Sequence, residues 1–214
     1  MSTSPDAYAL LRDVPVMDQQ PATSVPTEAK RLREWIEAMP RANLQVAQAQ
    51  LRDALVCLAR QRMDGKERLA SLEMLRSPLG EVVASIETSL AGSMLPLSAE
   101  RERQVQDAEF FHVQMGHGYR RVVADLCAPA GKLPFLGGGN VAMALGRALG
   151  HYVQALRLAW RTHRSPADGC WQGLHRCHGF VQAQSLGDKK IDDPLRFAEG
   201  SLGTFYLAPQ LAAL

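Results

Sequence analysis

Apolar residues recur at steps of three and four along most of the chain, the period of an α-helix that buries one face. Turn and capping residues divide this pattern into six segments. The pattern predicts helices that begin at Thr27, at Asn43, after Gly65, and near Ser98, Asn140 and Gly169. The last three are expected to end near Leu126, His163 and Ser185.

Several residues are expected to shape these helices. Thr27 and Asn43 can act as N-caps, because their side-chain oxygens can accept a hydrogen bond from the first helical turn. Pro78 predicts a kink or a break in the third helix, since proline lacks a backbone donor. Gly116 and Gly118 are expected to weaken the middle of the fourth helix.

These elements predict an all-α fold, a bundle of antiparallel amphipathic helical hairpins with a flexible N-terminal leader. Residues 1–26, rich in proline and polar residues, form the predicted leader, residues 27–194 the helical bundle domain, and residues 195–214 an apolar tail without a clear period. The sequence shows no repeat of 30 to 45 residues, which argues against a TPR-type or HEAT-type array.

The helical stripes also predict which side chains form the core. Three tryptophans are expected as core anchors among aliphatic and aromatic residues. The expected core contains Trp35, Leu51, Leu55, Leu72, Leu79, Phe111, Leu149, Trp160, Trp171, Leu174 and Cys177.

Composition and charge narrow the possible classes of protein. Apolar residues make up 46% and charged residues 21%, typical of a folded globular chain. The net charge of +2 is too small for a typical nucleic-acid-binding surface, so no nucleic acid is expected as a partner. Without a secretory signal or a membrane span, and with four cysteines in helical surroundings, we expect a cytoplasmic protein.

The string CWQGLHRCHGF at residues 170–180 contains two types of metal ligand. Cys170 and Cys177 lie seven residues apart, about 10 Å along a helix, which is too far for one zinc ion to bind both. His175 and His178 are one turn apart and could share an ion only with ligands from elsewhere. Core packing therefore explains these cysteines better than a metal site, and no cofactor is expected.

Two further patterns are candidate sites. His112 and His117, five residues apart, face different sides of a helix, which favours interhelical hydrogen bonds over metal binding. The string LPFLGGGN at residues 133–140 precedes a helix and could cradle phosphate. No strand precedes it and no Gly-Lys-Ser/Thr follows, so a plain connection between helices is favoured.

Basic residues of the fifth helix form the remaining candidate site. Arg157, Arg161 and Arg164 share one side at steps of four and three. Arg147, His151 and the neighbouring Trp160 extend this basic face. A solvated face is the ordinary explanation, and binding of an anion or an acidic partner is the functional one.

Two longer strings resemble a family of gammaproteobacterial proteins, the atypical PilZ-type cyclic di-GMP receptor-like proteins, often labelled molecular chaperones. The first, residues 33–76, is REWIEAMPRANLQVAQAQLRDALVCLARQRMDGKERLASLEMLR, and it resembles the N-terminal helical domain of that family. The second, residues 169–194, is GCWQGLHRCHGFVQAQSLGDKKIDDP, and it resembles a later helix. The resemblance spans residues 31–194 and implies a helical fold.

In that family, a β-barrel with Arg-rich and Asp-x-Ser-x-x-Gly strings is expected to bind the cyclic dinucleotide. This chain has no Asp-x-Ser-x-x-Gly string, and its segment after Pro194 is expected to depart from the family pattern, as in a truncated or divergent member.

Three functional hypotheses follow. The first is a non-enzymatic helical interaction or regulatory module that binds a protein partner or itself. The second is a sensor that binds a small anionic nucleotide between helices, through Arg157, Arg161 and the loop at Gly137–Gly139. The third is an enzyme that uses a metal at His175 and His178. The sequence favours the first, because no catalytic set of residues is recognisable in it.

Overall fold

A computed structural model describes residues 25–26, 28–39, 43–90, 97–127, 139–162, 164–166 and 168–184. Every secondary-structure element in these ranges is an α-helix, which confirms the predicted all-α fold. The helices are α2 (Ala29–Glu37), α3 (Leu44–Arg60), α4 (Gly65–Leu90), α5 (Ala99–Cys127), α6 (Gly139–Arg161) and α7 (Asp168–Gln184). Three predicted segments lie outside the described residues. They are residues 1–24 of the leader, residues 133–138 of the LPFLGGGN string and the tail at residues 195–214.

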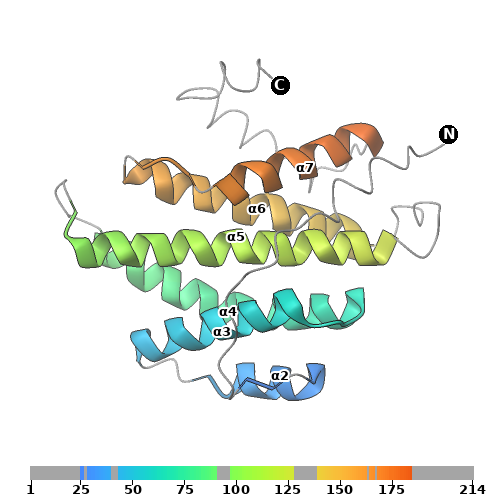
Figure 1. Cartoon of the computed structure of the whole chain (residues 1–214), viewed down its shortest axis with the longest axis horizontal. Helices are drawn as coiled ribbons and strands as arrows, with labels where there is room; N and C mark the ends of the chain where they lie inside the picture. Colours follow the sequence, from blue (N-terminus) through green and yellow to red (C-terminus); the bar gives the residue numbers. More distant parts are fainter. Residues whose placement is uncertain are drawn as a thin grey trace.

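Helix α5 lies at the centre of the bundle (Figure 1). It packs against α4 and α3 on one side and against α6 and α7 on the other, while α2 contacts α4. None of the described helices is long and apolar enough to cross a membrane.

The core fills the spaces between these helices. Eight of the residues expected there are buried: Leu51, Leu55, Leu72, Leu79, Phe111, Leu149, Leu174 and Cys177. The tryptophans were expected as core anchors, but Trp35, Trp160 and Trp171 are only partly buried and pack at the margin of the core. An indole exposes its polar edge more readily than leucine, and the centre of this bundle is filled by Phe111, Tyr119 and Tyr152 instead.

Side chains cap several helix starts. The side chain of Asn43 accepts a hydrogen bond from the Val46 amide at 3.2 Å, which confirms the predicted cap of α3. Asp64 caps α4 by accepting from the amides of Lys66 and Glu67, each at 2.8 Å. The first predicted cap is wrong, because Glu28 takes the N-cap position of α2 in place of Thr27. Asn140, near which the fifth helix was expected to begin, is the second residue of α6.

The helix-breaking residues do not divide their helices. Pro78 lies inside α4, which runs through Leu90 as one helix, so of the two predicted outcomes, a kink or a break, the break is wrong. Gly116 and Gly118 likewise lie inside an unbroken α5. A Cβ on Gly118 would lie 2.8 Å from Leu72, so this glycine lets α4 approach α5 closely.

Two arginines from other helices close the C-terminal end of α3. Arg68 of α4 donates to the carbonyls of Leu58 and Gln61, and Arg121 of α5 donates to the carbonyl of Ala59. Arg68 is buried and also forms an ion pair with Asp125. Cations suit this position because the last carbonyls of a helix have no partner within it and carry partial negative charge.

The Tyr152 side chain joins α5, α6 and α7. It is fully buried and its ring lies between Gly116 of α5 and Gly173 of α7. A Cβ would come within 2.7 Å of the ring at Gly116 and within 2.2 Å at Gly173. Only glycine leaves room for the ring at these positions, so the packing of three helices depends on them.

We expect Gly173→Ala to lower the free energy of unfolding by about 1 to 3 kcal/mol, because the added methyl overlaps the Tyr152 ring. Gly150→Ala in α6 is the matched control. Its Cβ would meet nothing within 4 Å, so the better helix propensity of alanine should raise stability by about 0.5 to 1 kcal/mol. Urea denaturation measures both, and equal effects at the two positions would contradict the packing described.

Candidate functional site

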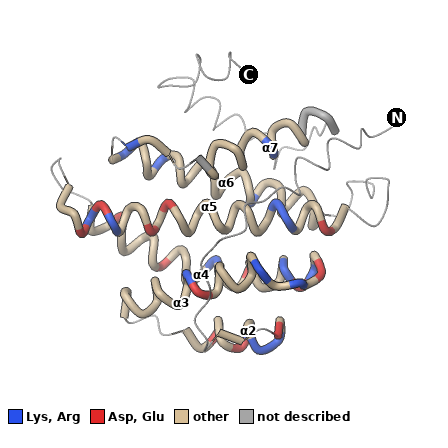
Figure 2. The backbone as a smooth tube through the Cα atoms, in the orientation of Figure 1, with Lys and Arg blue, Asp and Glu red and all other residues tan. Residues whose placement is uncertain are grey.

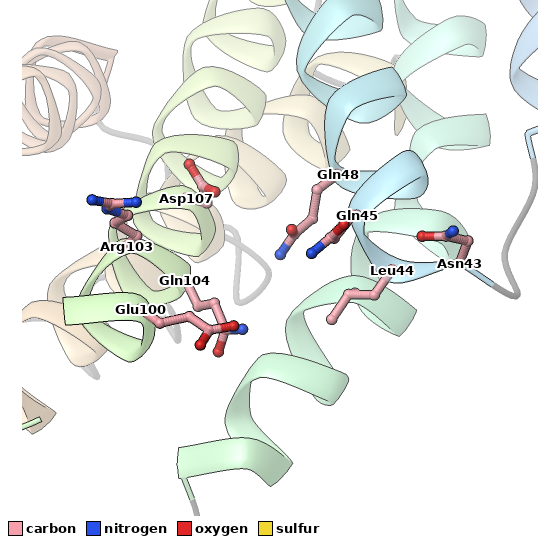
Figure 3. A pocket seen from close by; sticks show the side chains of 8 residues that line it. All are labelled: Asn43, Leu44, Gln45, Gln48, Glu100, Arg103, Gln104 and Asp107. Atoms are coloured by element: carbon pink, nitrogen blue, oxygen red, sulfur yellow. The ribbon is translucent and has the colours of Figure 1, made fainter. Parts of the chain in front are cut away.

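A polar groove separates the first turns of α3 and α5. It has a volume of about 380 Å³ and is open to solvent. In Figure 3, Gln45 and Gln48 of α3 extend toward α5, and Leu44 lies beside them. The groove is lined by Asn43, Leu44, Gln45, Gln48, Glu100, Arg103, Gln104 and Asp107.

Part of the lining of this groove is held by internal bonds. Asp107 is paired with Arg52, whose guanidinium lies 4.5 Å from the centroid of the Phe110 ring. Gln104 accepts a hydrogen bond from Ser89 at 3.3 Å. The buried Nε2 atom of Gln48, by contrast, has no hydrogen-bond partner within the described part of the chain. The groove therefore offers amide, carboxylate and guanidinium groups to a binding partner.

A second polar cluster joins α4, α5 and α6 around Glu73. Its carboxylate accepts hydrogen bonds from Tyr119 at 2.7 Å and from Arg76 at 2.9 Å. The Arg147 Nε lies 3.6 Å from the Glu73 Oε1. Burial alone would raise the pKa of Glu73, but these bonds and the two positive charges lower it below its usual value. Glu73 is therefore ionised at neutral pH.

A buried histidine pair adjoins the Glu73 cluster. His151 of α6 stacks on Tyr119 and shares a hydrogen bond with His112 of α5, with 2.9 Å between the two Nδ1 atoms. Burial lowers the pKa of His112 to about 4. The pKa of His151 lies well below its usual value because of burial and of the charges of His112, Arg76 and Arg147. Both imidazoles are therefore neutral at pH 7, one donating and the other accepting.

His117 forms the other predicted interhelical bond, with the Tyr152 hydroxyl at 2.7 Å. Burial lowers the pKa of His117 to about 3, assisted by the charges of Arg120, Arg121 and Arg176. The prediction that His112 and His117 form interhelical hydrogen bonds is thus confirmed.

The predicted basic face of three arginines is not one surface. Arg157 and Arg161 are exposed on α6, but the helix ends at Arg161. Arg164 lies in the following connection, where it pairs at 3.3 Å with the buried carboxylate of Glu109. It therefore fastens the α6–α7 connection to α5. Basic and acidic residues are interspersed along α2, α3, α4 and α5, whereas α6 has basic residues and no acidic one (Figure 2).

The Cys and His residues of α7 are placed by packing. Cys170 and Cys177 are buried free thiols, and the Cys170 Sγ donates to the Tyr152 carbonyl. Burial raises the pKa of Cys177 to about 12, although the charge of Arg120 opposes the shift. His175 and His178 are partly exposed. Among the described residues, no three His, Cys, Asp or Glu side chains are grouped to hold a metal ion.

Sequence reasoning missed the groove and the Glu73 cluster. Each joins helices far apart in sequence, such as Gln48 with Asp107 and Glu73 with Tyr119 and Arg147. Helical period assigns a residue to a face but does not show which face of another helix it meets. The sequence offered one signal for the Glu73 cluster. Glu73 is a charged residue that directly follows Leu72 of an apolar stripe.

One family model matches the chain. Its description is Cyclic-di-GMP receptor FimW, N-terminal domain, and it matches residues 30–214. The match includes residues 195–214, so the expected departure from the family pattern after Pro194 is wrong. No curated protein and no solved structure gives a significant match.

The buried histidines predict a loss of stability in mild acid. Their pKa values are lower in the folded chain than the ordinary value of about 6.5, so the unfolded chain binds more protons as the pH falls from 6.5. Each should therefore subtract up to about 1.4 kcal/mol per pH unit from the free energy of unfolding between pH 6.5 and 5.

Urea denaturation at pH 8, 6.5 and 5 tests this expectation. Stability should be nearly constant between pH 8 and 6.5 and fall below it, and His112→Gln should reduce the slope. A stability that does not change between pH 6.5 and 5 would mean that the histidines are not buried as described.

Proposed function

Because the chain belongs to the family of the N-terminal domain of the cyclic-di-GMP receptor FimW, we propose that it is a non-enzymatic regulatory module that acts through contact with a protein, including a second copy of itself. Family membership supports a role related to cyclic-di-GMP signalling and carries the proposal. The free cysteines favour the cytoplasm as its compartment.

The groove between α3 and α5 is the contact surface that we assign to this function. The groove combines the apolar Leu44 with amides and charges of both signs. Such a mixture of an apolar anchor and a polar rim is typical of non-obligate protein interfaces.

A sensor for a small anionic nucleotide is the second candidate. The family description names a cyclic-di-GMP receptor, and Arg157 and Arg161 are exposed on the last turns of α6. In this case the nucleotide would stabilise the folded chain by an amount that grows with the logarithm of its concentration above the dissociation constant.

Light scattering of the whole chain, with and without cyclic di-GMP, separates the two candidates. Under the contact proposal, the mass exceeds that of one chain and does not depend on the nucleotide. Gln45→Lys in the groove should weaken the association by about tenfold or more, because it places an unpaired charge in the contact.

The matched control is Gln172→Lys, the same change at an exposed position of α7. It should leave the mass unchanged. A single-chain mass in every condition would contradict self-association, and a melting temperature that rises only with cyclic di-GMP would favour the sensor.

A further inference from the structure

Two arginines from different helices converge on one carboxylate at the surface. Arg76 of α4 and Arg147 of α6 both pair with Glu73, at 2.9 Å and 3.6 Å. Their side chains are 40% and 38% exposed, more than the Glu73 side chain at 29%. The guanidinium groups are therefore reachable from solvent while their internal partner lies deeper.

The bonding around Arg147 is incomplete. Its Nε atom is buried and makes no hydrogen bond to any described residue, although the Glu73 carboxylate lies within ion-pair distance. Burying a donor without a partner is unfavourable, so the contact with Glu73 does not fully satisfy this guanidinium.

The charges in this cluster are unbalanced in a way that favours binding of an anion. Glu73 supplies one negative charge to two guanidinium groups, and the adjoining His112 and His151 are neutral. Part of the acceptor capacity of Glu73 is used by Tyr119. A phosphate group carries up to two negative charges with three strong acceptor oxygens, and its geometry matches the guanidinium fork.

From these observations we propose that Arg76 and Arg147 form a binding site for the phosphate group of a small ligand, with Glu73 as the internal anion that the phosphate displaces or joins. Tyr119 and the histidine pair hold the site from beneath, since Tyr119 bonds Glu73 and stacks on His151. The site involves none of the residues that line the α3–α5 groove, so it stands independently of the contact function proposed above.

Isothermal titration of the whole chain with inorganic phosphate, against chloride of equal ionic strength, tests the site. Arg147→Gln should weaken phosphate binding by about tenfold or more, because a charge-assisted hydrogen bond is lost. Arg147→Lys, which keeps the charge without the fork, should fall between the wild type and Arg147→Gln. Arg62→Gln, the same change at an exposed arginine outside every site described above, is the matched control and should change nothing.

Glu73→Gln supplies a readout that a structural role would not give. The amide oxygen can still accept from Tyr119, but the competing negative charge is gone, so phosphate should bind more tightly by about tenfold even though the ion pairs are lost. Weaker binding by this variant, equal effects of Arg147→Gln and Arg62→Gln, or no phosphate binding by the wild type would each overturn the proposal.

A parallel titration with cyclic di-GMP identifies the source of the phosphate. If Arg147→Gln weakens the nucleotide and inorganic phosphate alike, the site takes a nucleotide phosphate, whereas an effect on inorganic phosphate alone assigns it to the free ion. Gln45→Lys in the groove should leave both titrations unchanged, which separates failure of this site from failure of the contact function.

Discussion

The close approach of α5, α6 and α7 around the Tyr152 ring constrains the rest of the structure. The ring fits because Gly116 and Gly173 have no Cβ, and its hydroxyl is satisfied by His117. Protein interiors are packed about as densely as organic crystals, so this contact fixes the spacing of three helices together. The position of Cys170, which bonds the Tyr152 carbonyl, follows from it.

This close packing explains why the polar groups inside the bundle are neutral or paired. A charged imidazole would be costly between α5 and α6, so His112 and His151 bond each other and His117 bonds a phenol. Buried charges are matched in the same way, Glu109 with Arg164 and Arg68 with Asp125. Arg68 and Arg121 also take up the end carbonyls of α3, so these cations replace water where the helix end is covered.

The sequence predicted the elements well because they depend on local information. Helical period located the starts near Asn43 and Ser98, and the aliphatic core followed from the same stripes. It failed where tertiary packing overrides local preference. Gly116 predicts a weak helix by propensity, yet its missing Cβ accommodates Tyr152, and Pro78 is tolerated inside α4. Arg164 was assigned to a helical face because no local signal shows that a buried Glu109, 55 residues earlier, is its partner.

Helix α5 is the element shared by the groove and the two-arginine site. Asp107 lies at the groove and Tyr119 beneath Glu73, twelve positions apart and so about 18 Å along one helix. Coupling between two such sites requires a part with two discrete arrangements, because a packed core does not deform continuously. Under the proposed phosphate site, Glu73 is that element, since its carboxylate binds Tyr119 of α5 and the arginines of α4 and α6, and an anion at the arginines would release it from one set of partners. A ligand shifts such an equilibrium only through its different affinity for the two arrangements. Phosphate would favour the arrangement in which the Glu73 carboxylate is displaced, so its binding would affect the rest of the bundle through this side chain.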